Sequence, residues 1–460
     1  MKKLIITIFL IILLFTLGCE KDDITNIDDK PTATITTADK DYSIRFGING
    51  GLYSDGEDRK ELNSLKRELD DIGYIWLRHI GKAAWFDIQS ERGVWDWSLF
   101  DNVLLDDKHP WIIEIFGSTG TVYPLGDFSS EDMRAIPQSG GSKNDIMDYV
   151  KANSIDFDDP QQLADTEDYV KTFVTRYKDQ VKYWEVSNEG INAPTRATAI
   201  KYSYGWIKEV HPDAIVMVTG VAGSTDGMFS NGVETMDLLL EQGLGDYFDL
   251  GNFHHYGLIQ DDFEKQLEDA YDAYQGVFDK HGIDKPIWVT ETGTSSAEDS
   301  TLSGPSSEEL QAQHVVKRLV VFSAKGAEKV FWHSYGATHE DNKFYQCNIV
   351  HPDTREPKPS FYTFKLIVEK IGYFETVETL RTDDVRLYKF TNPDDKIVYV
   401  AWTPTDPQTV DLSEYINSEN VLVTHIIETR ESNKAEREEM QTNNVDLTIS
   451  PIFIEEIWWK

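Results

Sequence analysis

The sequence predicts an α/β protein, a closed (β/α)8 TIM barrel followed by a small all-β sandwich domain. Short apolar runs alternate with longer amphipathic stretches over residues 41–372, a pattern typical of a parallel sheet with connecting helices. Over residues 373–460 the helical stretches stop and alternating strand-like segments replace them. Eight apolar runs separated by helices fit one barrel, and they are Ser43–Ile48, Tyr74–His79, Trp111–Phe116, Val181–Val186, Ile215–Thr219, Phe248–His254, Ile287–Thr290 and Val330–Trp332.

The helical stretches have helical spacing of their apolar residues. Leu62, Leu65, Leu69 and Ile72 recur at intervals of three and four residues, and Gly73 ends that helix. Further helices are predicted over Glu167–Arg176, Thr198–Val210 and Leu310–Ala324, the last opened by a capping box of Ser306 and Glu309.

A doubly wound open sheet is the competing α/β layout. It calls for a glycine-rich phosphate loop directly after the first strand. Gly47–Gly51 is rich in glycine, but it lacks the GxGxxG spacing and no helix starts on it. The pattern therefore favours the barrel.

The C-terminal segment is predicted to be β throughout. Val385–Phe390 and Ile397–Trp402 flank the turn residues Asn392–Asp395 and indicate a hairpin. Val421–Ile427 and Val445–Ile457 add further alternating strand. We expect a sandwich that packs beside the barrel and supports it.

The N-terminus has the features of a secretory signal. Met1–Lys3 is basic, Leu4–Leu17 is almost wholly apolar, and Gly18 precedes Cys19. The segment resembles a bacterial lipoprotein signal, which implies removal of residues 1–18 and lipidation of Cys19. An uncleaved anchor helix is the alternative, although the apolar run is short for a membrane span.

Residues 19–40 contain no aromatic side chain and are predicted to form a flexible acidic tether. The acidic start of this tether resembles the export tags of some surface lipoproteins. We expect a protein held in the cell envelope by a lipid anchor in the outer membrane. The sequence leaves open whether it faces the periplasm or the cell surface. Cys347 then has no cysteine partner, so no disulfide is expected.

The formal net charge of −36 excludes one class of partner. Such a charge repels nucleic-acid phosphates at long range, so no nucleic-acid partner is expected. The composition supplies enough apolar residues for one large and one small core, and we expect a monomer.

Two glutamates end predicted barrel strands. Alternation along Val181–Val186 continues to Glu189, which places this residue at the rim of the barrel interior. Glu291 follows the apolar strand Ile287–Thr290 in the same way. The loops at the carboxyl ends of barrel strands form the active site, and two carboxyl groups are what cleavage of a glycosidic bond requires.

Together these residues resemble the retaining glycoside hydrolases of clan A. In that clan an Asn-Glu pair ends strand 4 and a glutamate ends strand 7, as Asn188, Glu189 and Glu291 do here. Other positions also match the clan pattern, namely Arg78 after strand 2, His254 and Tyr256 near strand 6, and Trp332 at the end of strand 8. Glu91–Trp97 resembles the corresponding segment of family 39 and its relatives.

The resemblance implies a role for each residue. Glu189 is the acid/base, and desolvation at an apolar rim favours its protonated form. Glu291 is the nucleophile, held ionised by Arg78 and oriented by Tyr256. The resemblance implies five substrate-binding residues, Arg78, Asn188, His254, Tyr256 and Trp332. Asn188 would bind the sugar 2-hydroxyl, and Trp332 would stack under the reacting ring.

No metal or other cofactor is expected, because retaining chemistry needs none and His79, His333 and His339 form no tight ligand motif. The partner is a carbohydrate, an oligo- or polysaccharide. The alternative from another class is a non-catalytic, surface glycan-binding lipoprotein on a decayed barrel. Such a relic would have the two carboxylates splayed apart or committed to salt bridges.

Overall fold

The computed structural model describes residues 35–50, 59–78, 85–116, 123–125, 154–189, 193–223, 231–257, 263–300, 303–336 and 346–457. The predicted signal segment 1–18, the lipidation site Cys19 and most of the tether lie outside the described residues. Among those that are described, no helix combines the length and apolarity needed to cross a bilayer.

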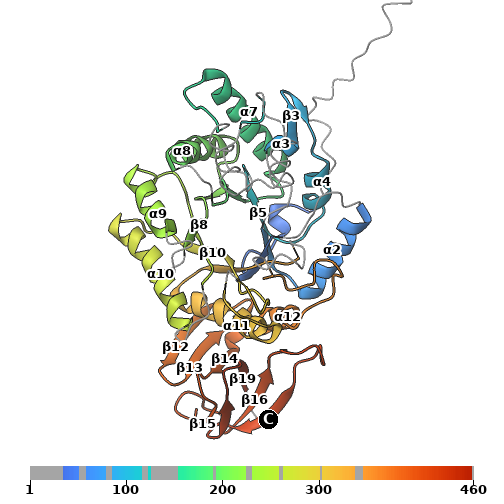
Figure 1. Ribbon diagram of the computed structural model, residues 1–460, viewed down its shortest axis with the longest axis vertical. Helices are drawn as coiled ribbons and strands as arrows, with labels where there is room; N and C mark the ends of the chain where they lie inside the picture. Colours follow the sequence, from blue (N-terminus) through green and yellow to red (C-terminus); the bar gives the residue numbers. More distant parts are fainter. Residues whose placement is uncertain are drawn as a thin grey trace, which may run out of the picture.

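The first part of the chain is a parallel barrel surrounded by helices (Figure 1). Its strands are β1 (Phe46–Asn49), β2 (Trp76–Arg78), β5 (Trp111–Glu114), β6 (Tyr183–Glu185), β7 (Ile215–Met217), β8 (Val221–Gly223), β9 (Gly251–His255), β10 (Ile287–Thr292) and β11 (Lys329–His333). The helices that follow successive strands are α2 (Arg59–Ile72), α4 (Ser98–Leu104), α7 (Pro160–Tyr177), α8 (Ala193–Val210), α9 (Asn231–Glu241), α10 (Phe263–Lys280), α11 (Glu308–Lys325) and α12 (Pro359–Ile371).

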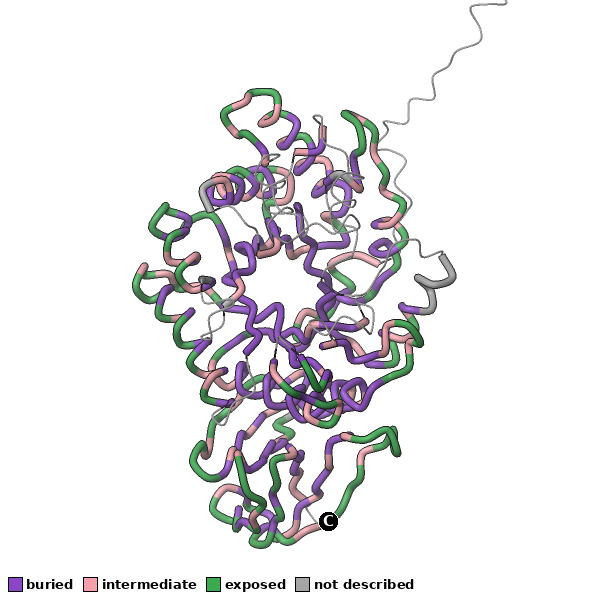
Figure 2. Tube along the Cα trace, in the orientation of Figure 1, coloured by how far each residue is buried: buried purple, intermediate pink, exposed green. Residues whose placement is uncertain are grey.

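Strands β7 and β8 are two segments of one barrel strand, interrupted at residues 218–220. β7 pairs with β6, whereas β8 pairs with β9, and Met217 bridges to Leu250 directly before β9. Pairing therefore runs around the whole barrel, and the buried trace forms a ring inside the more exposed helices (Figure 2). The predicted barrel is confirmed.

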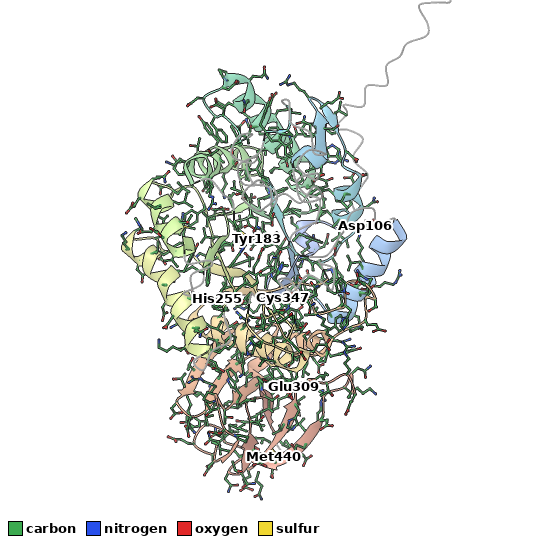
Figure 3. All side chains as sticks on the ribbon, in the orientation of Figure 1. Asp106, Tyr183, His255, Glu309, Cys347 and Met440 are labelled. Carbon is green, nitrogen blue, oxygen red and sulfur yellow. The ribbon has the colours of Figure 1, made fainter. Side chains whose placement is uncertain are left out.

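Aromatic rings fill the part of the barrel interior that lies toward the amino-terminal ends of the strands. Trp76 lies 4.8 Å from Tyr183 and 4.9 Å from Trp288 between ring centroids, and Phe331 packs on the same group. Figure 3 shows side chains filling this region around the labelled Tyr183. A Cβ on Gly47 would lie 2.4 Å from the Phe331 ring, so the glycine-rich first strand serves this packing.

Two residues further along the same four strands, the inward side chains become polar. Because side chains alternate along a strand, these residues stand on the aromatic layer and face the rim. They are Arg78, Glu185, Thr290 and His333.

The connection from β2 to β5 also holds the short elements α3 (Trp85–Ile88), β3 (Gln89–Glu91) and β4 (Val94–Trp95). At the other pole, the 3-10 turn η2 (Thr37–Asp39) contacts the barrel through the Thr37 amide, which donates to the Asp179 carbonyl at 2.6 Å. Lys40 is buried, so the last residues of the predicted tether belong to the folded unit.

The cap of one helix was predicted one residue too early. Ser307, not Ser306, is the N-cap of α11, and its hydroxyl accepts from the Leu310 amide at 3.1 Å. The Ser306 amide donates to the Ala297 carbonyl, which places Ser306 in the loop before the cap.

The C-terminal residues form two antiparallel sheets. The larger contains β12 (Thr376–Thr382), β13 (Arg386–Thr391), β14 (Ile397–Trp402), β16 (Asn420–His425), β17 (Arg437–Gln441) and β19 (Ile452–Glu456), and the smaller β15 (Gln408–Val410) and β18 (Val445–Leu447). The predicted hairpin is confirmed as β13 and β14, joined at the 3-10 turn η3 (Pro393–Asp395). The predicted strand-forming stretch Val445–Ile457 is confirmed as two strands, β18 and β19, which belong to different sheets.

The larger sheet is apolar on both faces. Leu387, Tyr399 and Ala401 point into the core of the β domain, whereas the alternate residues Tyr388 and Trp402 belong to the barrel core. The indole of Trp402 donates to Oε1 of Glu264 in α10 at 2.8 Å. The β domain is therefore packed on the barrel helices.

Candidate active site

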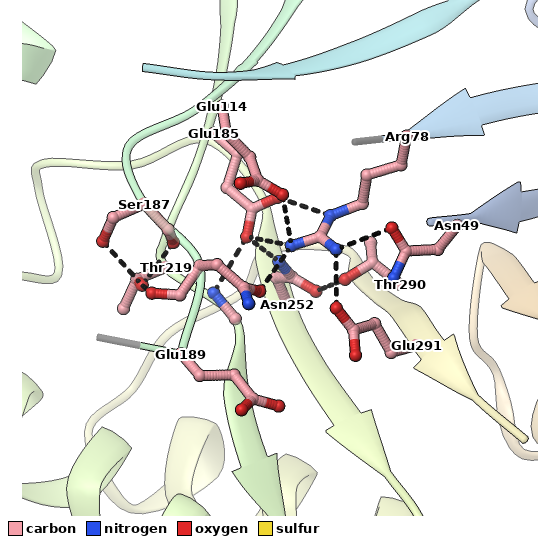
Figure 4. A network of polar contacts seen from close by, with 12 residues as sticks. Asn49, Arg78, Glu114, Glu185, Ser187, Glu189, Thr219, Asn252, Thr290 and Glu291 are labelled. Atoms are coloured by element: carbon pink, nitrogen blue, oxygen red, sulfur yellow. Dashed lines mark hydrogen bonds and ion pairs between the residues drawn. The ribbon is translucent and has the colours of Figure 1, made fainter. Parts of the chain in front are cut away.

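Arg78, at the end of β2, is the centre of a buried polar network (Figure 4). Its Nε and Nη2 atoms donate to the two oxygens of Glu185 at 2.7 and 3.0 Å. Its Nη1 atom donates to Oε1 of Glu291 at 2.9 Å and to Asn49, and Glu114 lies 3.2 Å from Nη2. Burial alone lowers the pKa of Arg78, but these carboxylates outweigh it and raise the pKa well above its usual value.

Glu291 reaches the interior because of an irregularity in β10. The pairing register shifts between Val289 and Glu291 on the β9 side, and between Val289 and Thr292 on the β11 side. Strict alternation would send Glu291 outward, since Thr290 already faces the interior. A β-bulge of this kind re-aims one side chain, and here it brings Glu291 onto Arg78.

The surroundings of Glu291 favour the ionised carboxylate. Tyr256 donates from its hydroxyl to Oε2 at 2.6 Å. Burial alone raises the pKa of Glu291, but positive charge on His254, His333 and Arg78 outweighs it. With the Tyr256 hydrogen bond, these groups hold the pKa well below its usual range.

Glu189 stands at the rim, across from Glu291. Its side chain is 35% exposed, so it is only partly removed from solvent. The reason is its position above the last paired residue of β6, Glu185, where the loop begins. Arg196, in the first turn of α8, donates to the Glu189 carbonyl at 2.6 Å and fixes this part of the backbone.

His254 lies between the two glutamates. Its Nδ1 atom is 2.8 Å from Oε1 of Glu189 and 3.5 Å from Oε2 of Glu291. Burial alone lowers the pKa of His254, but the charges of Glu291 and Glu189 and the hydrogen bond to Glu189 raise it above its ordinary value.

A chain of hydrogen bonds orients the His254 ring. Asn252 donates through Nδ2 to Glu185 at 2.8 Å, so its Oδ1 atom is the acceptor for the Thr290 hydroxyl. The Thr290 oxygen must then accept from His254 Nε2, 3.1 Å away. This assignment leaves Nδ1 facing the carboxylates, as a donor when protonated and as an acceptor when neutral.

The predicted residue Asn188 also belongs to the network. Its Oδ1 atom accepts from Arg78 Nη2 at 2.9 Å, which leaves the Nδ2 amide as the group that can donate to a ligand at the rim.

Trp332 departs from the prediction. Its side chain is completely buried in the main core, and its Nε1 atom donates to the Cys347 carbonyl at 2.9 Å. By register, the neighbour that faces the interior is His333, which pairs with Asn49. A tryptophan with no exposed surface cannot stack under a sugar, so the predicted role for Trp332 is wrong.

Sequence reasoning missed the supporting residues Asn49, Glu114, Glu185, Asn252, Thr290 and His333. One signal was available: polar residues at alternate positions near the ends of otherwise apolar strands. His79 and His339 lie outside the described residues.

The acidic and imidazole atoms of the site form one compact group. One ligand atom each from Glu189, His254 and Glu291 lies within 4.8 Å of the others. The carboxyl separation of a retaining glycosidase is about 5–5.5 Å, whereas an inverting enzyme needs about 6.5–9.5 Å for its water.

Comparisons with known proteins found one matching family model. Residues 195–346 match the family model described as glycosyl hydrolase catalytic core, a segment that contains His254, Tyr256 and Glu291 and begins after Glu189. No curated protein sequence matches the chain.

Solved structures share the fold. A family 39 glycoside hydrolase from the gut symbiont Bacteroides cellulosilyticus is 16% identical with a TM-score of 0.62, over 90% of this chain and 81% of that one. AbfB, a family 51 alpha-L-arabinofuranosidase from Bifidobacterium longum, is 12% identical with a TM-score of 0.55, over 94% and 97%. A glucosidase from Croceicoccus marinus is 12% identical with a TM-score of 0.54, over 90% and 96%.

The segment matched by the family model and the shared architecture lead to one conclusion. Residues 195–346 are similar to a glycosyl hydrolase catalytic core, and the chain shares its barrel fold with solved glycoside hydrolase structures.

Proposed function

We propose that this protein is a retaining glycoside hydrolase acting on an oligo- or polysaccharide, with Glu291 as nucleophile and Glu189 as acid/base. The observation that carries the proposal is the convergence of the two carboxylates, whose nearest oxygens lie within 4.8 Å. The surroundings of the two groups differ in the way the two roles require. Glu291 is buried and held by Arg78 and Tyr256, whereas Glu189 is partly exposed and lies beside His254.

In the first step the Glu189 proton passes to the glycosidic oxygen while a Glu291 oxygen attacks the anomeric carbon. The glycosidic bond breaks, the leaving alcohol departs, and a glycosyl ester forms on Glu291. In the second step Glu189, now ionised, takes a proton from water, and that water attacks the anomeric carbon. The ester bond breaks, which restores Glu291 and releases the sugar with net retention.

His254 supports the acid. In its neutral form, with Nε2 donating to Thr290, its Nδ1 atom accepts from a protonated Glu189 at 2.8 Å. The pair can therefore hold one shared proton beside the scissile bond. Asn188 supplies an amide donor that suits the sugar 2-hydroxyl, a contact that strengthens as the oxocarbenium-like transition state forms.

The test is turnover of an aryl-glycoside and polysaccharide panel by the wild type, Glu291→Gln and Glu189→Gln. Loss of Glu291 should abolish turnover, and loss of Glu189 should lower it by about 10²–10⁴-fold. The exposed Glu298→Gln is the matched control, and thermal unfolding checks that each variant folds. Full activity of Glu291→Gln would remove the nucleophile assignment.

A second readout separates the two roles. Azide should rescue Glu291→Gly with an inverted glycosyl azide as product, because it attacks the face that the nucleophile leaves empty. The same anion should rescue Glu189→Gly with a retained product. Binding of glycans by the wild type without hydrolysis would favour the non-catalytic glycan-binding lipoprotein. Transfer of the sugar to another acceptor would keep the chemistry.

The cellular placement is also part of the proposal. The basic, then apolar, N-terminal segment before Cys19 supports removal of residues 1–18 and a lipid anchor in the cell envelope. Cys19→Ala should move the protein from the membrane fraction to the soluble fraction. Size-exclusion chromatography with light scattering tests the expected monomer.

A further inference from the structure

Beyond hydrolysis, we propose that the sugar-free site binds one Zn²⁺ ion through Glu189, His254 and Glu291. The ligand atoms are one oxygen from each carboxylate and the Nδ1 atom of the imidazole, all within 4.8 Å of one another. This ion is a competitor for the catalytic groups and has no part in the proposed reaction.

One of the ligand-atom distances already suits a tetrahedral ion, and the Glu189 carboxylate must move to complete the site. Zinc bonds of about 2.0–2.2 Å at tetrahedral angles place neighbouring ligand atoms about 3.4 Å apart. His254 Nδ1 and Glu291 Oε2 are already 3.5 Å apart. The 2.8 Å contact between Nδ1 and Glu189 must widen, and the partly exposed Glu189 side chain has room to turn.

The imidazole is prepared as a ligand by its neighbours. Thr290 accepts from Nε2, and Asn252 in turn accepts from the Thr290 hydroxyl. Metal-bound histidines commonly donate their second ring nitrogen to such a partner, which fixes the ring and its tautomer. The Nδ1 lone pair of the neutral ring therefore points at the two carboxylates.

The charge of the surroundings favours a dication once the imidazoles have lost their protons. Four carboxylates gather at or next to the site, and two guanidinium groups oppose them, so the ensemble stays negative when the imidazoles are neutral. These groups are Glu114, Glu185, Glu189 and Glu291, with Arg78 and Arg196 opposing them. The completely buried His254 contacts the partly exposed Glu189, so an ion would reach the imidazole past the Glu189 side chain.

The mixed donor set selects zinc over the hard cations. One imidazole nitrogen and two carboxylates, with water as the fourth ligand, match the preference of Zn²⁺. Mg²⁺ requires near-octahedral oxygen ligands and keeps most of its waters, so it should bind far more weakly.

Titration calorimetry of the purified protein with ZnCl₂ or MgCl₂, without sugar, tests the proposal. The wild type should bind one Zn²⁺ with micromolar affinity, and Mg²⁺ should give no measurable heat. His254→Gln and Glu189→Gln should each weaken zinc binding by at least about tenfold. The matched control is His425→Gln, which removes a surface histidine 2.8 Å from Glu438 and should leave the affinity unchanged.

Equal zinc affinity in the wild type and both site variants, or loss of affinity in His425→Gln alone, would overturn the proposal. A crystal soaked in ZnCl₂ gives a measurement that does not depend on variants. An anomalous peak between the three ligand atoms supports the site, and a map without that peak refutes it. Because no turnover is measured, these outcomes are independent of whether the protein hydrolyses glycosides.

Discussion

The Nδ1 atom of His254 lies 2.8 Å from Oε1 of Glu189, and the other nitrogen of the same ring is committed to Thr290. This relationship couples a partly exposed carboxyl group to a fully buried hydrogen-bond chain that ends on Glu185. The proton shared by Glu189 and His254 therefore depends on the buried residues Thr290, Asn252 and Glu185, which a sugar at the rim does not contact.

Thr290→Val should lower kcat/KM by about tenfold and move the basic limb of the pH profile to lower pH. Valine keeps the shape of threonine but removes the acceptor for His254 Nε2, and a buried donor without a partner costs about 1–3 kcal/mol. The proton shared with Glu189 is then held less tightly. Thr166→Val, a buried threonine in α7, is the control and should leave the pH profile unchanged.

Tyr256→Phe should lower kcat by about 10–100-fold, because a hydrogen bond to a charged group contributes about 1.5–3 kcal/mol. The lost donor lies 2.6 Å from Glu291 and favours its ionised form. Without it the pKa of Glu291 rises, so the acidic limb of kcat/KM should move to higher pH. A pH–rate profile identical to that of the wild type would contradict this role.

His254 should make the folded protein more stable at low pH than at high pH. Its pKa in the folded state is raised above its ordinary value of 6.5, although burial alone lowers it. The stabilisation is therefore fully present below about pH 6.5 and is lost as the pH rises through the folded-state pKa. Chemical unfolding should show a larger difference between wild type and His254→Gln at pH 5.5 than at pH 8.5. An equal or reversed difference would contradict the assignment.

Gly220→Ala should lower kcat/KM by about 100-fold, the cost expected for misplacing a catalytic group by about 1 Å. A Cβ at this position would lie 2.4 Å from Nε2 and 2.7 Å from Cε1 of His254 and would push the ring off Thr290. Gly205→Ala is the matched control. It lies on the exposed side of α8 with nothing within 4 Å of the added Cβ, and it should raise stability by about 0.5–1 kcal/mol.

Trp402→Ala should destabilise the protein by about 3–5 kcal/mol, as expected for truncating a buried tryptophan. The residue belongs to the β domain, but its ring lies in the barrel core and its indole donates to Glu264. Urea unfolding measures the loss. Ile449→Ala, with a 42% exposed side chain, should change stability by less than about 0.5 kcal/mol.

Periodicity was sufficient to predict the barrel, since all eight predicted strands exist within a few residues of the expected positions. It was not sufficient for the division of Val445–Ile457 between two sheets, because both parts read as strand and only tertiary pairing separates them. The position of the cap of α11 depended on which of two adjacent serines places its hydroxyl within reach of the Leu310 amide.

The site was predicted in part. Strand alternation and the resemblance to clan A indicated Arg78, Asn188, His254, Tyr256 and the two glutamates, and the structure brings these six residues together. The prediction that Trp332 faces the interior was wrong. Alternation assigns the two faces of a strand only when the direction of one residue is known, and in β11 the residue that faces inward is His333. The bulge that turns Glu291 inward involves pairing on both sides of β10, which no single strand encodes.

The sheet that presents apolar side chains on both faces has an implication for how such a chain can be inherited. If the β domain were deleted, the barrel helices that it covers would expose a large apolar surface. The isolated β domain would expose the apolar face of its larger sheet in the same way. The two parts must therefore be gained, lost and diversified together.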